Sequence, residues 1–100
     1  MAEYYVEDNV VAAAEADGWF CRKLKWEGRD GAPDRLFVKA GRVVFIEFKD
    51  KDRKSKGLQK NECKRLKDAG AEVYVNVDTI MQGCRILGCK PLRAEHALCR

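Results

Sequence analysis

The chain has 100 residues, of which 46% are hydrophobic and 36% charged, and its formal net charge is +4. This length suits one domain with a single core and is too short for a catalytic domain joined to a separate binding domain. The composition is too hydrophobic for a wholly disordered chain. The longest uninterrupted apolar run is only Val10 to Ala14, so we expect no signal peptide and no membrane span. We therefore expect one cytoplasmic domain over residues 1–100, with its folded core at about 3–88.

The first predicted element is a helix over residues 3–17. Its apolar residues recur at helical spacing, and an Asp-Gly pair ends it. Glu7 lies inside the apolar stripe, level with Ala14, whereas Glu3 lies in the first turn, where an acid is stabilised by the helix dipole. An acid in an apolar stripe needs a partner or a chemical role. Glu7 is therefore the more notable of the two, and either could be the functional acid of this helix.

Residues 19–26 predict a first strand, and a loop rich in glycine and charge leads from it to Pro33. The next two apolar runs are separated only by Lys39-Ala40-Gly41, which is typical of a β-hairpin. If Ala40 and Gly41 form the turn, opposed residues have numbers that sum to 81. Asp34 then faces Glu47.

The chemistry of this hairpin depends on that register. Directly opposed side chains have Cβ atoms about 4.5–5.5 Å apart, and like charges at that separation are destabilising. The usual reason to keep such a pair is a divalent cation held between hard oxygen ligands. Lys49 shares the face of Glu47, whereas Val44, Ile46 and Phe48 point to the core. A slip of one residue would move Asp34 to the other face and destroy the arrangement.

The remaining elements alternate between helix and strand. Beyond a charged loop at residues 50–57, a helix over 58–69 places Gln59 on the same face as Cys63 and ends at Gly70. A strand over 71–77 follows, and its pattern predicts three inward side chains: Val73, Val75 and Val77.

A capping box at Thr79 and Gln82 begins a last helix that reaches about Leu87. The order of elements is helix, three strands, helix, strand, helix. We predict an α/β fold in which helices flank a small mixed sheet, with the last strand parallel to its neighbour through a right-handed crossover.

The positive charge is concentrated in one segment. Residues 49–67 hold nine Lys or Arg against three acids, a local charge of +6, so the rest of the chain sums to −2. A charge run alone is more often a solvated helix face, but this one adjoins the paired carboxylates. It therefore predicts a polyanionic partner, since basic side chains release the counterions condensed on nucleic acid. The residues expected to contact DNA are Lys51, Arg53, Lys54, Lys56 and Lys60.

The five cysteines do not predict a structural metal. They are irregularly spaced without a Cys-x-x-Cys motif, and His96 is the one imidazole. Cys84 and Cys89 form the most metal-like pair, but buried or partly exposed thiols in a reducing cytosol are the better interpretation.

Several of these motifs together closely resemble the VRR-NUC (virus-type replication-repair nuclease) domain, of the standalone phage or bacterial type. That family belongs to the PD-(D/E)XK nuclease superfamily, whose core has the order α-β-β-β-α-β. The resemblance spans residues 7–77, and the motifs that carry it are Gly31-Ala32-Pro33-Asp34, Phe45-Ile46-Glu47-Phe48-Lys49, Leu58-Gln59 and Gly70 before a valine-rich strand.

The resemblance implies a role for each site residue. Asp34 and Glu47 would bind Mg²⁺ or Mn²⁺ together with the backbone carbonyl of Phe48, and Glu7 would assist the metal site or its water. Lys49 would be the catalytic amine, either positioning the attacking water or offsetting charge on the phosphorus. Gln59 would orient water or the scissile phosphate. No organic cofactor is expected.

These expectations favour a metal-dependent DNA endonuclease that acts on branched DNA such as four-way (Holliday) junctions. The resemblance to standalone members implies a homodimer, which would place two sites on two strands. The alternatives are a restriction-type or end-processing nuclease on linear DNA, a non-catalytic nucleic-acid-binding module of the same fold, and a protein-interaction domain with a coincidental triplet. The expected location is the cytoplasm, including the host cytoplasm if the protein is phage-encoded.

Overall fold

The computed structural model describes residues 2–49 and 57–92, with side chains described over 5–49 and 61–92. The predicted order of helix, three strands, helix, strand, helix is confirmed. The first strand is shorter than the predicted 19–26. The elements are α1 (Ala2–Ala16), β1 (Phe20–Lys23), β2 (Arg35–Lys39), β3 (Arg42–Phe48), α2 (Gly57–Asp68), β4 (Glu72–Val77) and α3 (Ile80–Leu87).

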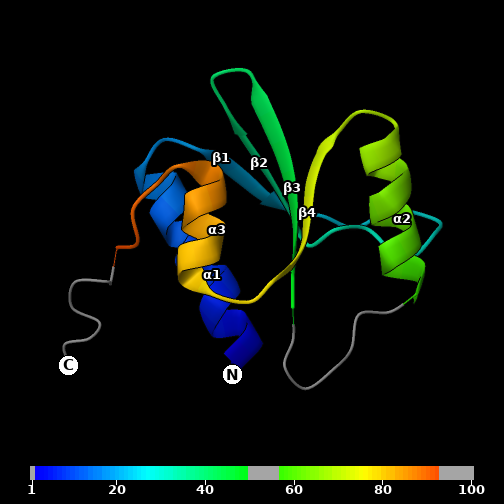
Figure 1. Ribbon diagram of the computed structural model, residues 1–100, viewed down its shortest axis with the longest axis horizontal. Coiled ribbons are helices and arrows are strands. Elements are labelled where there is room, and N and C mark those ends of the chain that lie inside the picture. The colour runs from blue at the N-terminus through cyan, green and yellow to red at the C-terminus, as the bar shows by residue number, and fades with distance from the viewer. Residues whose placement is uncertain (1, 50–56, 93–100) are drawn as a thin grey trace.

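The four strands form one mixed sheet in the order β1-β2-β3-β4. β2 is antiparallel to both β1 and β3, and β4 pairs with β3 in parallel, as the sequence predicts. Figure 1 shows α1 and α3 side by side against one face of the sheet, with α2 on the other side of the molecule next to β4. No helix in the described part of the chain is long and apolar enough to cross a membrane.

The β2–β3 hairpin has the two-residue turn on which the predicted register depends. Ala40 and Gly41 both have positive φ, 49° and 85°, as a type I′ turn requires. Val38 pairs with Val43, so opposed residues do sum to 81. The ladder continues to the pair of Arg35 and Ile46.

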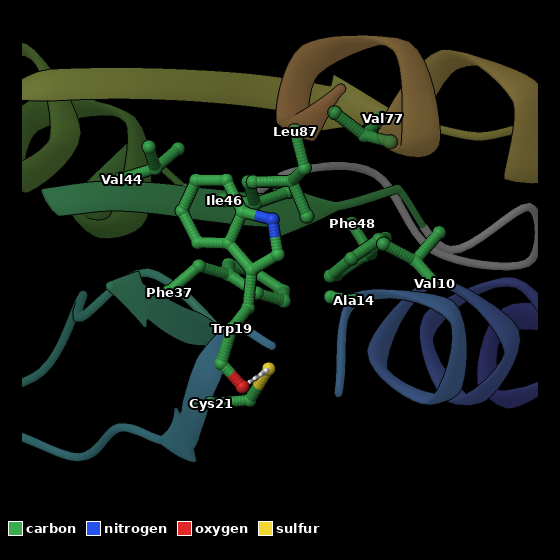
Figure 2. Packing of buried hydrophobic residues seen from close by; sticks show 10 residues of the cluster. All are labelled: Val10, Ala14, Trp19, Cys21, Phe37, Val44, Ile46, Phe48, Val77 and Leu87. Carbon is green, nitrogen blue, oxygen red and sulfur yellow. Dashed lines mark hydrogen bonds between the residues drawn. The ribbon is translucent and has the colours of Figure 1, made fainter. Parts of the chain in front are cut away.

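The main core lies between the sheet and the pair α1 and α3. Figure 2 shows α1 residues Val10 and Ala14 near Phe48 of β3, with the Trp19 indole beside the sheet residues. Gly83 of α3 packs so closely on α1 that a Cβ there would lie 2.6 Å from Val10 Cγ2. The buried cluster comprises Val10, Ala14, Trp19, Cys21, Phe37, Val44, Ile46, Phe48, Val77 and Leu87.

The prediction that three valines of β4 point inward is wrong for Val75, which is 40% exposed. On β3, Ile46 and Phe48 are two residues apart, but their partners Tyr74 and Val77 are three apart. β4 therefore contains a bulge, and within it Asn76 has a φ of 59°. The extra residue puts Val73 and Val77 on opposite faces of the sheet.

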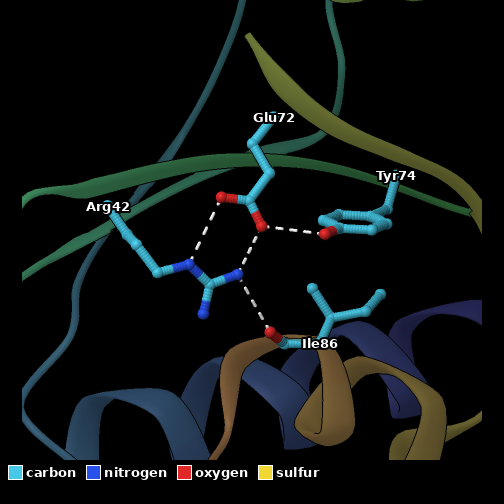
Figure 3. Close-up of polar contacts among 4 residues, drawn as sticks. All are labelled: Arg42, Glu72, Tyr74 and Ile86. Carbon is cyan, nitrogen blue, oxygen red and sulfur yellow. Dashed lines mark hydrogen bonds and ion pairs between the residues drawn. The ribbon is translucent and has the colours of Figure 1, made fainter.

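One polar network joins the sheet to α3 (Figure 3). The Arg42 guanidinium pairs with the Glu72 carboxylate and donates to the Ile86 carbonyl at 3.1 Å, and the Tyr74 hydroxyl donates to Glu72 at 2.8 Å. The hydrogen bonds from Arg42 lower the pKa of Glu72 below its ordinary value. The network clamps β3, β4 and α3 together.

The predicted cap of α3 is also present. Thr79 Oγ1 accepts from the backbone N–H of Gln82 at 3.0 Å, and Gln82 Oε1 accepts from the N–H of Asp78 at 3.1 Å. The helix ends at Gly88, which is in the left-handed region.

Candidate functional site

Asp34 lies at the open end of the hairpin, where hydrogen bonds join it to β3 and to the residue that follows β1. Its Oδ2 accepts from the backbone N–H of Phe48 at 2.7 Å, and its backbone carbonyl accepts from Leu24 N at 3.1 Å. Pro33, immediately before it, is buried. The carboxylate is therefore directed at the end of β3, next to Glu47.

Glu47 is buried within the sheet, with only 2% of its surface exposed. The hairpin register places it opposite Asp34, one step beyond the pair of Arg35 and Ile46. Burial, together with the nearby negative charges of Glu47 and Asp34, raises the pKa of the Cys63 thiol on α2 to about 11. Both carboxylates are thus near Cys63, on the α2 side of the sheet.

Lys49 follows the last residue of β3. Its backbone N–H donates to the Val77 carbonyl at 2.8 Å, which extends the parallel pairing with β4. Its side chain is exposed. The amine is therefore available to a substrate that approaches the open end of the hairpin.

Glu7 reaches the same end of the hairpin from the other face. It is 7% exposed, as its place in the apolar stripe predicts. Its Oε2 accepts from Arg35 Nε at 2.6 Å and lies 3.9 Å from Lys23 Nζ. Arg35 pairs with Ile46 in the sheet and so points toward α1, away from Asp34 and Glu47. The structure thus shows Glu7 bonded to Arg35, and its role at a metal stays a prediction.

Other predicted site residues fall outside the described side chains. Gln59 and Lys60 belong to α2, and only their backbone is described. Glu3 is likewise described only as part of α1. Four of the predicted DNA-contacting residues lie outside the described residues altogether: Lys51, Arg53, Lys54 and Lys56.

Sequence reasoning missed Glu62, which joins the loop before β2 to α2. Trp26 Nε1 donates to Glu62 Oε1 at 2.8 Å, and Arg29 Nη2 lies 3.1 Å from Glu62 Oε2. The adjacent Cys63 is buried, and the charges of Glu47 and Asp34 raise the pKa of its thiol. Glu62 is the one acid in the second half of a basic segment, and that isolation is a signal that could have drawn attention to it.

The donor set fits magnesium or manganese better than a structural metal. In residues 2–49 and 57–92, no three or more His, Cys, Asp or Glu side chains are grouped to hold an ion. Mg²⁺ does not need such a cage, because it keeps several waters and is usually bound by one or two carboxylates. Asp34, Glu47 and the Phe48 carbonyl are hard oxygen donors of this kind.

Comparison with known proteins identifies the family. No protein-family model matches the chain, and no curated protein matches it. A solved structure described as a VRR_NUC domain matches with a TM-score of 0.77 and 34% sequence identity, over 88% of this chain and 96% of that one.

The fold and the hairpin are accordingly those of a nuclease of the PD-(D/E)XK type, a class whose members typically depend on a metal and act on DNA. Within that class, the chain belongs to the VRR-NUC family.

Proposed function

We propose that this protein is a Mg²⁺- or Mn²⁺-dependent endonuclease that hydrolyses phosphodiester bonds in branched DNA such as four-way junctions. One observation carries the proposal: the two-residue turn at Ala40 and Gly41 sets a register in which Asp34 and Glu47 are opposed at the mouth of the hairpin. Two opposed carboxylates supply the hard oxygen ligands that Mg²⁺ and Mn²⁺ prefer. The hydrogen bond from Phe48 N keeps Asp34 directed toward Glu47.

Each residue of the hairpin has a role in this proposal. Asp34, Glu47 and the carbonyl of Phe48 hold the ion, which when bound supplies a Lewis acid and lowers the pKa of a coordinated water. Lys49 offers an exposed ammonium group that either positions the attacking water or offsets the charge that builds on the phosphoryl oxygens. Gln59 orients water or phosphate, and Glu7 assists the metal site directly or by fixing Arg35.

The substrate and the assembly are the finer part of the proposal. The local charge of +6 over residues 49–67 favours a polyanion beside the site. A homodimer in the cytoplasm would present two hairpin sites related by two-fold symmetry, which suits paired cuts at a junction. A nuclease for linear DNA and a non-catalytic binding module remain the rivals.

The test is cleavage by the purified full chain of a synthetic four-way junction and of a linear duplex that contains the same sequences. We expect junction cleavage with Mg²⁺ or Mn²⁺ and none in EDTA. Asp34→Asn and Lys49→Ala should each reduce the rate at least about 100-fold, the cost of losing one charge-stabilising group in a hydrolytic site. Asp8→Asn and Lys90→Ala, both at exposed positions, are the matched controls and should cleave normally.

The rivals give different results in the same assay. Preferential cleavage of the linear duplex would identify a nuclease for linear DNA. Salt-dependent binding that EDTA does not change, without any cleavage, would identify a binding module. Full activity of the Asp34→Asn variant would contradict the mechanism itself.

A further inference from the structure

The sheet has an apolar face that none of the described helices covers. Because α1 and α3 pack on one face and α2 lies beside β4, the other face of β1, β2 and β3 is open (Figure 1). Two rows of cross-strand partners lie on it. We call these six residues the open face: Phe20, Val38 and Val43 in the outer row, and Arg22, Leu36 and Phe45 in the inner row.

Three residues of the open face, Phe20, Arg22 and Val43, are exposed, and the other three, Leu36, Val38 and Phe45, are half-buried. Phe20 is 48% exposed and Val43 is 46% exposed, whereas their neighbours along the strands, Cys21 and Val44, are buried in the core. The Arg22 guanidinium lies 4.1 Å from the centre of the Phe20 ring. A contiguous apolar patch of this kind usually marks a binding surface.

The open face is continuous with the candidate catalytic site. Side chains on one face of a strand recur every two residues, about 7 Å along the strand. Along β2, the outer and inner rows lead from Val38 through Leu36 to Asp34, the residue just before the strand. Along β3, they lead from Val43 through Phe45 to Glu47. A nucleotide next to a phosphate at the acidic pair would therefore lie over the inner row.

The charge on the open face favours nucleic acid over a second copy of the chain. In a two-fold contact that superposes two open faces, each Arg22 would lie against a face that holds no acid of its own, and burial of a charge without an opposite partner is costly. The nearest acids, Asp34 and Glu47, hold the metal ion in the proposed function. A DNA strand supplies phosphates for Arg22 and bases for the aromatic and aliphatic side chains. Aromatic residues on a sheet flanked by basic groups are a common platform for unpaired bases.

We propose that the open face seats the bases of unpaired DNA nucleotides adjacent to the scissile phosphate. This inference rests on the proposed nuclease function and narrows its substrate: the strand to be cut leaves the duplex at the site. Phe20 and Phe45 supply the stacking surface, the aliphatic residues complete it, and Arg22 contacts the backbone of the same strand.

The test separates base contacts from phosphate contacts. Fluorescence anisotropy in EDTA, where no cleavage takes place, would compare a short oligothymidylate with an abasic strand of equal length. For the wild-type chain we expect the base-bearing strand to bind about 5- to 100-fold more tightly, the range measured for stacking of a base on an aromatic side chain. Phe20→Ala should weaken binding of the base-bearing strand and leave the abasic strand unchanged.

The control and a second readout keep this test decisive. Met81→Ala changes a residue of α3 that is 56% exposed on the opposite side of the sheet, and it should alter neither affinity. Because Phe20 is half exposed, its replacement should leave the thermal midpoint nearly unchanged, which also shows that the variant folds. In cleavage assays, Phe20→Ala should slow the cutting of a substrate with an unpaired arm more than that of a fully paired one.

Three results would overturn the inference. The first is equal binding of the two strands by the wild-type chain, and the second is equal weakening of both by Phe20→Ala. The third is conversion of a dimer to a monomer by Phe20→Ala in sedimentation without a change in base discrimination, which would make the open face an interface between copies. Base discrimination by a chain that cleaves no DNA would support the open face and reject the nuclease. Cleavage without base discrimination would support the nuclease and reject the binding of bases by the open face.

Discussion

The Asp34 side chain has two separate roles: it accepts a hydrogen bond from Phe48 N, and it offers a negative charge to a cation. An asparagine can accept the same bond through Oδ1, but it carries no charge and is a weaker ligand for a hard cation. The charge lies opposite a buried Glu47, and like charges directly opposed across two strands repel each other. Stability and function should therefore respond to this residue in opposite directions.

We accordingly expect Asp34→Asn to raise the free energy of unfolding in EDTA by about 0.5–1 kcal/mol, through relief of the opposed charges. Mg²⁺ should stabilise the wild-type chain, because it binds the folded state, and should leave the variant unchanged. Urea unfolding with and without Mg²⁺ measures both effects. Asp8→Asn, on the exposed face of α1, is the control, and equal stabilisation of both chains by Mg²⁺ would show that the ion binds elsewhere.

For single residues, the sequence predicted burial on a helix face but not contacts between distant parts of the chain. The burial of Glu7 followed from helical spacing, because neighbours on a helix face are fixed by local geometry. Its bond to Arg35 did not, since the two residues are 28 positions apart and meet only when α1 packs on the sheet. The contacts of Glu62 with Trp26 and Arg29 are long-range in the same way.

At the scale of elements, the hairpin was predictable and β4 was not. Two residues, Ala40 and Gly41, determine the turn and hence the register of both strands, so a local pattern was sufficient. In β4 the alternation of Val73, Val75 and Val77 predicts a regular strand, but the strand contains a bulge at which Asn76 adopts a left-handed conformation. Side-chain periodicity gives no sign of such a bulge. The sequence thus predicted the register of the hairpin correctly but assigned the Val75 side chain of the edge strand wrongly.

The contact between α1 and α3 gives a prediction at the same scale. A Cβ at Gly83 would lie 2.6 and 3.1 Å from the two methyl groups of Val10. Gly83→Ala must therefore push the helices apart or strain the core, and we expect it to lower the free energy of unfolding by about 1–3 kcal/mol. Urea denaturation provides the measurement.

The matched background for that change is Val10→Ala, which removes both methyl groups. In that background Gly83→Ala should be nearly neutral or should stabilise by up to about 1 kcal/mol, because alanine is the better helix former. An equal cost of Gly83→Ala in both backgrounds would mean that the glycine is needed for something other than this contact.

At the scale of the whole molecule, the two sides of the sheet are built differently. The side of α1 and α3 holds the main core, and the α/β class with its flanking helices was predictable from the order of elements. The other side carries the carboxylate pair, the open face and α2. Cys63 is the one buried residue among the described side chains of α2. The sequence did not reveal this asymmetry, because alternation shows which residues share a face of a sheet but not whether a helix covers it.

This asymmetry predicts that α2 opens more readily than the rest of the fold. Few buried apolar contacts hold α2, so its amides should exchange with deuterium faster than those of α1 and β3. Glu62→Ala removes the bonds from Trp26 and Arg29, and we expect it to speed exchange in α2 and in the loop over residues 24–33 about fivefold, as the loss of about 1 kcal/mol implies. Exchange in α1 should not change, because α1 packs on the opposite side of the sheet. Mass spectrometry of peptic fragments makes the comparison. A uniform increase across all fragments would show that Glu62 supports the whole fold rather than the wall of the site.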